Sequence, residues 1–188
     1  MKKRILVKNM VCDRCKTLLE QEFEKVGITV TSIELGEIVF MEKEGVDDNF
    51  IEALLVKNGF ELVREAGLMQ NEHIRIALIE AVDKLAGDSP ENLSDYLSKK
   101  LNKDYSVLSK AFSKQEGITI ERYYINLKIE KVKELIQLQH LNFSEIAYSL
   151  NYKSSSHLAS QFKAVTGMSM SNYRNLQQWG RKPLDQIV

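Results

Sequence analysis

The apolar positions of residues 143–150 have the period of a short amphipathic helix. They stand at i, i+3, i+4 and i+7 and are Phe143, Ile146, Ala147 and Leu150. This spacing predicts one buried stripe, and either Asn142 or Ser144 can cap the helix. Asn151 tolerates the left-handed conformation that a tight turn needs, so we expect the helix to end there.

A second apolar stripe follows a run of serines. Its members are Leu158, Phe162 and Val165, and the serines before them can cap a second helix. Two short helices joined by a tight turn predict a helix-turn-helix, whose second helix enters a DNA major groove. The outward face of that helix consists of small, polar or cationic side chains: Ser155, Ser156, Ala159, Ser160 and Lys163.

A similar pair of helical stripes lies upstream. Leu93, Leu97 and Leu101 form one stripe, while Leu108 and Phe112 form another before Gly117. Residues 120–138 have helical spacing too and predict a helix that connects the two pairs.

The first third of the chain has a different pattern. Residues 4–8, 28–35, 38–41 and 60–63 read as strands, and Gly36 with Glu37 marks a hairpin. Helices are predicted over 15–26 and from Asp47 or Asp48 to Asn58, with Phe50 among the apolar residues of the second one. The order βαββαβ indicates an α+β, ferredoxin-like domain over residues 1–67, followed by an all-α double helix-turn-helix.

Between these parts, residues 68–89 predict a helical linker. Its apolar surface is broad, so we expect it to dock on the helical domain or on a partner chain, which favours a homodimer. Gly87, Ser89 and Pro90 then break the chain. We place the DNA-binding domain at 90–178 and a tail at 179–188, with Trp179 packed on the domain edge.

Composition and charge agree with a globular, two-domain protein. The chain has 188 residues, of which 44% are apolar and 28% charged. No apolar run approaches the roughly 20 residues that span a bilayer, so we expect a cytoplasmic protein without a membrane segment. Residues 1–67 hold 10 basic and 13 acidic side chains, and the remainder holds 16 and 13. No acidic residue occurs from Ile146 to Leu184, as a phosphate-facing surface requires.

The C-terminal pattern is similar to the signature of the AraC/XylS transcription regulators. The resemblance rests on Ile146-Ala147, Tyr152, Phe162-Lys163, Thr166-Gly167, Ser169 and Tyr173-Arg174. Three positions depart from the family: Asn151 stands for its usual Gly, Leu158 for its frequent Phe, and Met170 for its frequent Pro.

This resemblance implies double-stranded DNA as the partner, with two recognition helices in successive major grooves about 34 Å apart. Aligned from Phe112 and Gly117, the first pair presents Tyr105, Ser106, Ser109 and Lys110, with Lys114 nearer the DNA backbone. The expected contacts are Tyr105, Ser106, Ser109, Lys110, Lys114, Lys153, Ser155, Ser156, Ser160, Lys163 and Arg174. Because Ser and Lys dominate and Arg, Asn and Gln are the strong base readers, we expect modest intrinsic specificity, supplemented by dimerisation or by DNA shape.

The segment from Asn9 to Cys15 resembles the metal loop of heavy-metal-associated domains. Met10, Cys12 and Cys15 match that loop, and Gly59-Phe60 also match the family. The resemblance implies a soft ion such as Cu(I) on Cys12 and Cys15. Zinc is usually held by four ligands, so a second subunit or His73 would have to supply the others. A helix N-terminus and the Arg14 guanidinium predict a lowered thiol pKa. Thiol redox sensing and a degenerate domain kept for dimerisation stay open as alternatives.

The sequence therefore predicts a bacterial AraC-type transcription regulator that senses a soft metal through Cys12 and Cys15. The alternative is a metal-handling or thiol-redox protein whose helical half is a protein-interaction module. The chain has no phosphate loop, nucleophile elbow or zinc-protease motif, so we do not expect an enzyme.

Overall fold

The computed structural model describes residues 1–64, 66–86, 92–176, 178, 180–184 and 187. The chain divides into two compact units, Met1–Ile76 and Ala77–Val188. The division falls inside helix α3 (Ala66–Asp83), within the segment predicted as a linker. The predicted break at Gly87, Ser89 and Pro90 lies outside the described residues, as does Trp179.

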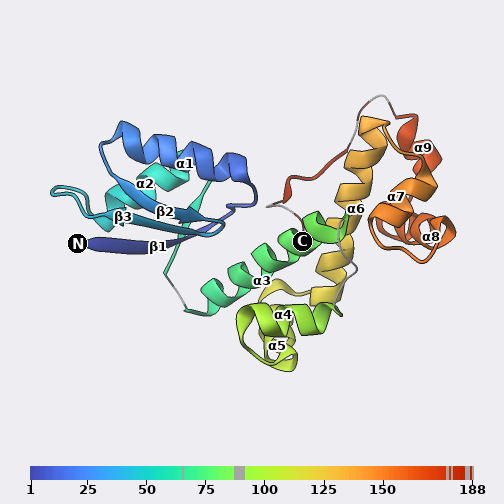
Figure 1. Ribbon diagram of the computed structural model, residues 1–188, viewed down its shortest axis with the longest axis horizontal. Helices are drawn as coiled ribbons and strands as arrows, with labels where there is room; N and C mark the ends of the chain where they lie inside the picture. The colour runs from blue at the N-terminus through green and yellow to red at the C-terminus, as the bar shows by residue number, and fades with distance from the viewer. Residues whose placement is uncertain (65, 87–91, 177, 179, 185–186, 188) are drawn as a thin grey trace. The chain divides into compact units, whose positions relative to one another are not determined.

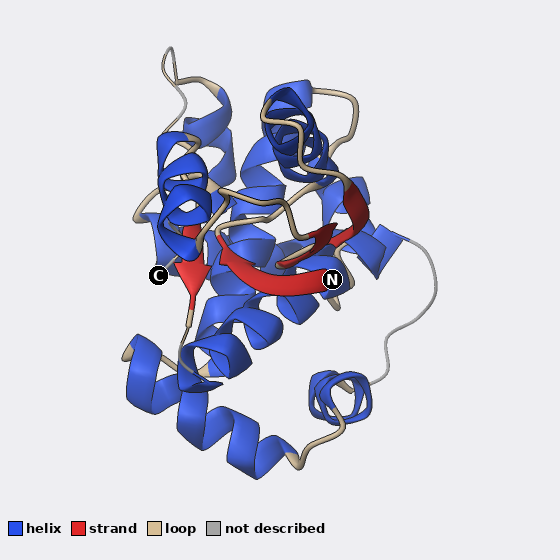
Figure 2. Cartoon of the chain, turned by 90° about the vertical axis from the view of Figure 1, so that its left-hand side faces the viewer, coloured by secondary structure: helices blue, strands red, loops and turns tan. Residues whose placement is uncertain are grey.

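The first unit contains the predicted βαββαβ order (Figure 1). Its four strands form one antiparallel sheet of order β2-β3-β1-β4, drawn in red in Figure 2. The elements are β1 (Lys2–Lys8), α1 (Asp13–Lys25), β2 (Val30–Glu34), β3 (Glu37–Met41), α2 (Asp48–Lys57) and β4 (Glu61–Val63).

One face of this sheet carries the core of the unit. Successive strand residues point to opposite faces, and Ile5, Val7, Ile38 and Phe40 are the buried members on the same face. Against them pack Leu19 and Phe23 of α1 and Ile51 and Leu55 of α2. The Phe23 and Phe40 rings meet edge to face at 5.4 Å between centroids. Both helices therefore cover the same side of the sheet, as Figure 1 shows.

Local signals set the ends of α2. The Asp47 carboxylate accepts a hydrogen bond from the Phe50 N–H at 2.8 Å and so caps the helix, one of the two predicted alternatives. The chain leaves the helix through Asn58 and through Gly59, whose φ is +83°. Helix α2 carries Phe50 as predicted, but Phe50 lies in the first turn and is 41% exposed, so it does not join the buried residues Ile51 and Leu55.

The second unit is helical. After the end of α3 and the short 3-10 helix η1 (Lys84–Ala86), it consists of α4 (Leu93–Leu101), α5 (Tyr105–Glu116), α6 (Ile120–Leu138), α7 (Phe143–Ser149), α8 (Ser155–Thr166) and α9 (Met170–Arg174). Helix α6 spans the residues predicted for the connecting helix, with the Thr119 hydroxyl accepting from the Arg122 N–H at 3.1 Å. Among the described helices, none is long and apolar enough to cross a lipid bilayer.

Candidate nucleic-acid interface

Helix α7 begins with a capping box. The Asn142 side-chain oxygen accepts from the N–H groups of Ser144 at 2.9 Å and Glu145 at 3.0 Å. The Glu145 carboxylate in turn accepts from the Asn142 N–H at 2.7 Å. This exchange satisfies N–H groups that a helix start otherwise leaves unpaired. Asn142 is therefore the cap, and the start of the first helix of the pair is fixed by sequence-local bonds.

The turn between α7 and α8 is tight. Asn151 adopts the left-handed conformation with φ +59°, as its residue type predicted. The Ser154 hydroxyl accepts from the His157 N–H at 3.1 Å and caps α8, which ends at Gly167 with φ +80°. A side chain at Gly167 would be strained in this conformation, so glycine suits the position.

Buried aromatic and aliphatic side chains orient α8. Leu158 and Phe162 are fully buried, and the Phe162 ring meets the Tyr173 ring of α9 edge to face at 5.5 Å. Burial of this stripe fixes the rotation of α8 about its axis. The opposite side of the helix consequently faces solvent.

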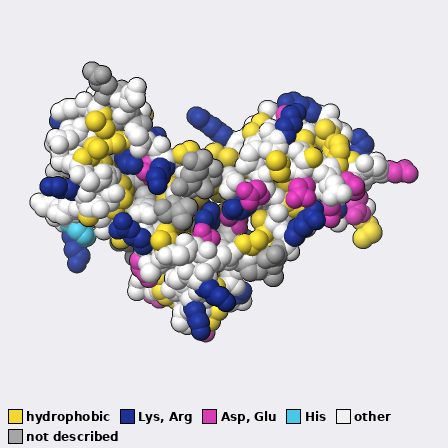
Figure 3. Space-filling model, turned by 180° about the vertical axis from the view of Figure 1, so that it is seen from behind, with side chains coloured by type: hydrophobic (Ala, Val, Ile, Leu, Met, Phe, Trp, Pro, Cys, Tyr) yellow, Lys and Arg dark blue, Asp and Glu magenta, His cyan; other side chains and the backbone are white. Residues whose placement is uncertain are grey.

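Most of the α8 residues predicted to contact DNA are exposed. Ser156, Ser160 and Lys163 are exposed, whereas Ser155, in the first turn, is half-buried. Lys153 is exposed in the turn before the helix, and Arg174 is exposed with its guanidinium carbon 4.9 Å from the Phe143 ring centroid. In the view of Figure 3, basic side chains outnumber acidic ones around α7–α9, while acidic side chains gather on the sheet-containing unit. We name the exposed residues Ser156, Ser160 and Lys163 the α8 face.

The two helix-turn-helix units repeat with an offset of 50 residues. The buried residues Leu108 and Phe112 of α5 correspond to Leu158 and Phe162 of α8, and each helix ends at a left-handed glycine. The centroids of the Phe112 and Tyr123 rings are 5.5 Å apart, and this pair corresponds to Phe162 and Tyr173 of the second helix-turn-helix. On this alignment Ser106 corresponds to Ser156 and Lys110 to Ser160. The structure thus places the two predicted outward faces at equivalent positions of their helices.

The outward side of α5 carries two exposed lysines, one more than the α8 face. Ser106, Lys110 and Lys114 are exposed, and Ser109 is half-buried. Tyr105 is half-buried as well, and its hydroxyl donates to the Glu121 carboxylate, a bond that lowers the pKa of Glu121. Burial and that carboxylate raise the pKa of Tyr105 above its ordinary range. A Tyr105 hydroxyl held in this way is not free to reach a base edge unless the bond to Glu121 breaks.

Lys128 of α6 contacts the second helix-turn-helix, and the sequence pattern did not predict this contact. Its ammonium nitrogen lies 3.9 Å from the centroid of the Tyr152 ring, at the turn before α8, and 5.9 Å from that of Tyr124. The Tyr152 hydroxyl donates to the side-chain oxygen of Gln161 on α8 at 2.6 Å. Burial lowers the pKa of Lys128 to about 8, although the aromatic rings favour its charged form. The one available signal was a lysine within the otherwise apolar stripe of the connecting helix.

The two cysteines lie together in the first unit. Cys12 is the N-cap residue of α1, Cys15 is in its first turn, and their sulfur atoms are 3.4 Å apart. The predicted lowering of the thiol pKa is wrong for Cys15, because burial raises its pKa and outweighs the backbone hydrogen bonds that favour the thiolate. Met10 is fully buried, and its sulfur accepts from the Gly36 N–H at 3.4 Å. Within the described ranges no third His, Cys, Asp or Glu joins the pair in a metal-binding group.

Comparison with known proteins agrees with the geometry of the helical unit. Residues 97–176 match the model of a family described as a helix-turn-helix domain. This segment is a helix-turn-helix domain. It contains α5 to α9 and the larger part of α4.

A curated relative is similar to part of the chain. The chain is 30% identical over 78 residues to the Msm operon regulatory protein of Streptococcus mutans serotype c, a stretch that covers 42% of this chain. The same stretch covers only 28% of the relative's length.

Several solved structures are also similar. The C-terminal domain of AraT, a response regulator from Geobacillus stearothermophilus, matches 54% of this chain and 82% of its own at 23% identity and a TM-score of 0.46. The C-terminal domain of the two-component response regulator yesN from Fusobacterium nucleatum matches 52% of this chain and 94% of its own at 26% identity and a TM-score of 0.45. The transcriptional regulator CdpR from Pseudomonas aeruginosa matches 92% of this chain and 55% of its own at 15% identity and a TM-score of 0.47. At these TM-scores the structural similarity adds nothing to what the family model shows.

Proposed function

We propose that this chain is a sequence-specific DNA-binding transcription regulator and not an enzyme. In this proposal α8 and α5 enter successive major grooves of double-stranded DNA, and α6 holds them at a fixed separation. The observation that carries the proposal is the α8 face: small, polar and cationic side chains on an AraC-type helix-turn-helix, in a segment without acidic residues from Ile146 to Leu184.

The two helix-turn-helix pairs differ in the charges around their second helices. The exposed cations Lys153, Lys163 and Arg174 surround the second recognition helix, whereas Asp104, Glu116 and Glu121 lie at the ends of α5 and beyond. Neutralising backbone phosphates supplies most of the affinity that does not depend on sequence. We therefore assign the larger electrostatic contribution to the second helix-turn-helix, and the first helix-turn-helix adds contacts through Lys110 and Lys114.

The salt dependence of DNA binding tests this proposal. If the five exposed cations Lys110, Lys114, Lys153, Lys163 and Arg174 each neutralise one phosphate, log K against log salt has a slope of about −4.5, at roughly −0.9 per contact. Fluorescence anisotropy with a duplex selected from a random pool measures this slope. The double variant Lys110→Ala/Lys163→Ala should reduce the slope by about 2. Absence of DNA affinity at low salt would remove the proposal.

As a second element we propose that Cys12 and Cys15 bind a soft monovalent ion such as Cu(I). The observation in favour is the 3.4 Å separation of two half-buried sulfur atoms, with no third His, Cys, Asp or Glu beside them among the described residues. Two thiolates suit a soft ion of low coordination number, whereas structural zinc is almost always held by four ligands. Because the pKa of Cys15 is raised, binding must release its proton and will be weaker at acidic pH.

Titration with Cu(I) tests the proposed metal site. Anaerobic titration with Cu(I) should show one equivalent bound by the wild type and none by Cys12→Ser/Cys15→Ser. If the ion is an effector, adding it must change operator affinity, and DNA must change ion affinity by the same factor. Equal operator affinity with and without Cu(I) would dismiss sensing and leave DNA binding intact.

The proposed function also includes a cytoplasmic location and a homodimer.

A further inference from the structure

Strand β1 has two edges that differ in how far they are paired. Its pairing with β3 runs from Lys2 to Leu6, but its pairing with β4 begins only at Leu6 and ends at Lys8. Strand β4 ends at Val63, and helix α3 begins at Ala66. On the β4 side, residues 2–5 of β1 consequently have no strand partner among the residues that the structure describes.

The direction of the backbone groups on that edge follows from the ladder. The Val7 N–H donates to the Gly36 carbonyl at 2.9 Å, and the Met1 carbonyl accepts from the Glu42 N–H at 2.8 Å, both toward β3. In an antiparallel ladder, alternate residues direct their N–H and C=O groups to opposite sides. Lys2 and Arg4 therefore direct theirs to the β4 side. These groups are the template that a further strand uses.

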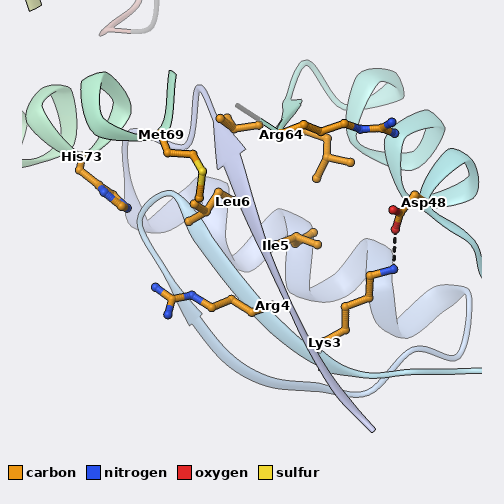
Figure 4. Close-up of a pocket in the computed structure, with 10 residues that line it drawn as sticks. Lys3, Arg4, Ile5, Leu6, Asp48, Arg64, Met69 and His73 are labelled. Atoms are coloured by element: carbon orange, nitrogen blue, oxygen red, sulfur yellow. Dashed lines mark hydrogen bonds and ion pairs between the residues drawn. The ribbon is translucent and has the colours of Figure 1, made fainter. Parts of the chain in front are cut away.

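A groove lies along the same edge. Its volume is about 490 Å³, and its apolar lining includes Leu6, Val63 and Met69. Figure 4 shows Met69 of α3 close to Leu6, while the side chains of Lys3 and Arg64 extend to the side of the groove where Asp48 lies. Among the described residues that line this groove, Asp48 is the one carboxylate, and the cations are Lys3, Arg4 and Arg64. The groove is thus an apolar strip with a cationic rim, on a unit whose overall charge is negative.

The cations of the rim take part in ion pairs that are easily exchanged. Lys3 contacts Asp48, Arg4 contacts Glu37, and Arg64 contacts Glu52. The Arg4 and Arg64 side chains are 64% and 55% exposed, and ion pairs at such positions contribute little to stability. An incoming carboxylate can therefore share these cations at small cost.

We infer that the Lys2–Ile5 edge of β1 is a docking site for an extended, acidic segment of a partner protein, which adds to the sheet as a strand. Its backbone would pair with Lys2 and Arg4, its acidic side chains would meet Lys3, Arg4 and Arg64, and its apolar side chains would enter the groove. A small amphipathic anion could satisfy the cations but not the backbone groups, which is why the geometry favours a peptide. The inference does not depend on DNA binding, since it concerns the sheet-containing unit.

The competing explanation is that these lysines and arginines protect the edge from pairing with other chains. A synthetic peptide of alternating Glu and Val separates the two. Added to the full-length ¹⁵N-labelled protein, it should shift the amide signals of Lys2 and Arg4, whereas a Lys/Val peptide of equal length should not. A Glu/Val peptide N-methylated at the residues that face β1 keeps the charge but lacks the N–H groups that pair with β1. It should therefore lose binding.

The matched variants are Arg4→Glu and Arg14→Glu. Both reverse one exposed arginine, but Arg14 lies on α1 and does not line the groove. Arg4→Glu should weaken the acidic peptide by about tenfold or more, and Arg14→Glu should leave it unchanged within about twofold. Equal binding of the N-methylated peptide, or full competition by free glutamate, would mean an anion site and overturn strand addition. Failure of every peptide to shift these signals would mean a protected edge and overturn the inference.

Discussion

Replacing Phe162 by Ala is expected to lower the free energy of unfolding of the helical unit by about 3–5 kcal/mol. The Phe162 side chain is fully buried and contacts the Tyr173 ring, so its removal leaves a cavity at the centre of the second helix-turn-helix. A loss of this size is a large part of the 5–15 kcal/mol that holds a typical domain together. We expect partial unfolding near room temperature and a matching loss of DNA affinity.

Urea titration followed by far-ultraviolet circular dichroism measures this effect. Phe112→Ala in the first helix-turn-helix is the matched variant, because Phe112 is equally buried and makes an equivalent contact with Tyr123. Lys163→Ala is the surface control and should change stability by less than about 0.5 kcal/mol. A loss below about 1 kcal/mol for Phe162→Ala would contradict the packing described for α8.

The second large effect is expected on binding and not on stability. Ser160→Asp places a carboxylate in the middle of the α8 face, where the proposal puts the negatively charged DNA groove. The loss of a favourable contact together with charge repulsion should weaken DNA binding on the order of 100-fold. Because Ser160 is exposed, the free energy of unfolding should change by no more than roughly 0.5 kcal/mol.

Ser160→Asn is the control for side-chain size, since it is nearly isosteric with aspartate and uncharged. It should keep most of the affinity, and the difference between the two variants should shrink as salt is raised. Equal affinity of Ser160→Asp and wild type at low salt would show that this face does not meet DNA. Such an outcome would favour the alternative in which the helical unit binds a protein.

Much of the fold could be predicted because its signals are local. The span of α6 followed from an uninterrupted helical period between Gly117 and Leu138, and Asn142 was one of the two polar residues predicted as the cap of α7. The left-handed turn at Asn151 likewise depends on the residue type and little else. These features are decided within a few residues along the chain, so the pattern itself contains the information.

The errors and omissions concern residues whose state depends on distant neighbours. The exposure of Phe50 is set by how α2 lies on the sheet, and the pKa of Cys15 by the burial of its loop. The bond between Tyr105 and Glu121 joins two helices, and Lys128 meets Tyr152 across more than twenty residues of chain. Helical periodicity places such residues on a face but does not say what that face meets.

The sequence by itself determined the order of the elements apart from η1 and α9, the helix-turn-helix signature and the Ser- and Lys-rich character of the α8 face, because periodicity, capping residues and charge are written along the chain. Only the tertiary structure decided that Cys12 and Cys15 lie 3.4 Å apart with the pKa of Cys15 raised, and that β1 has an unpaired edge beside a cationic groove among the described residues. The physical reason is that desolvation and strand pairing depend on which segments meet in space.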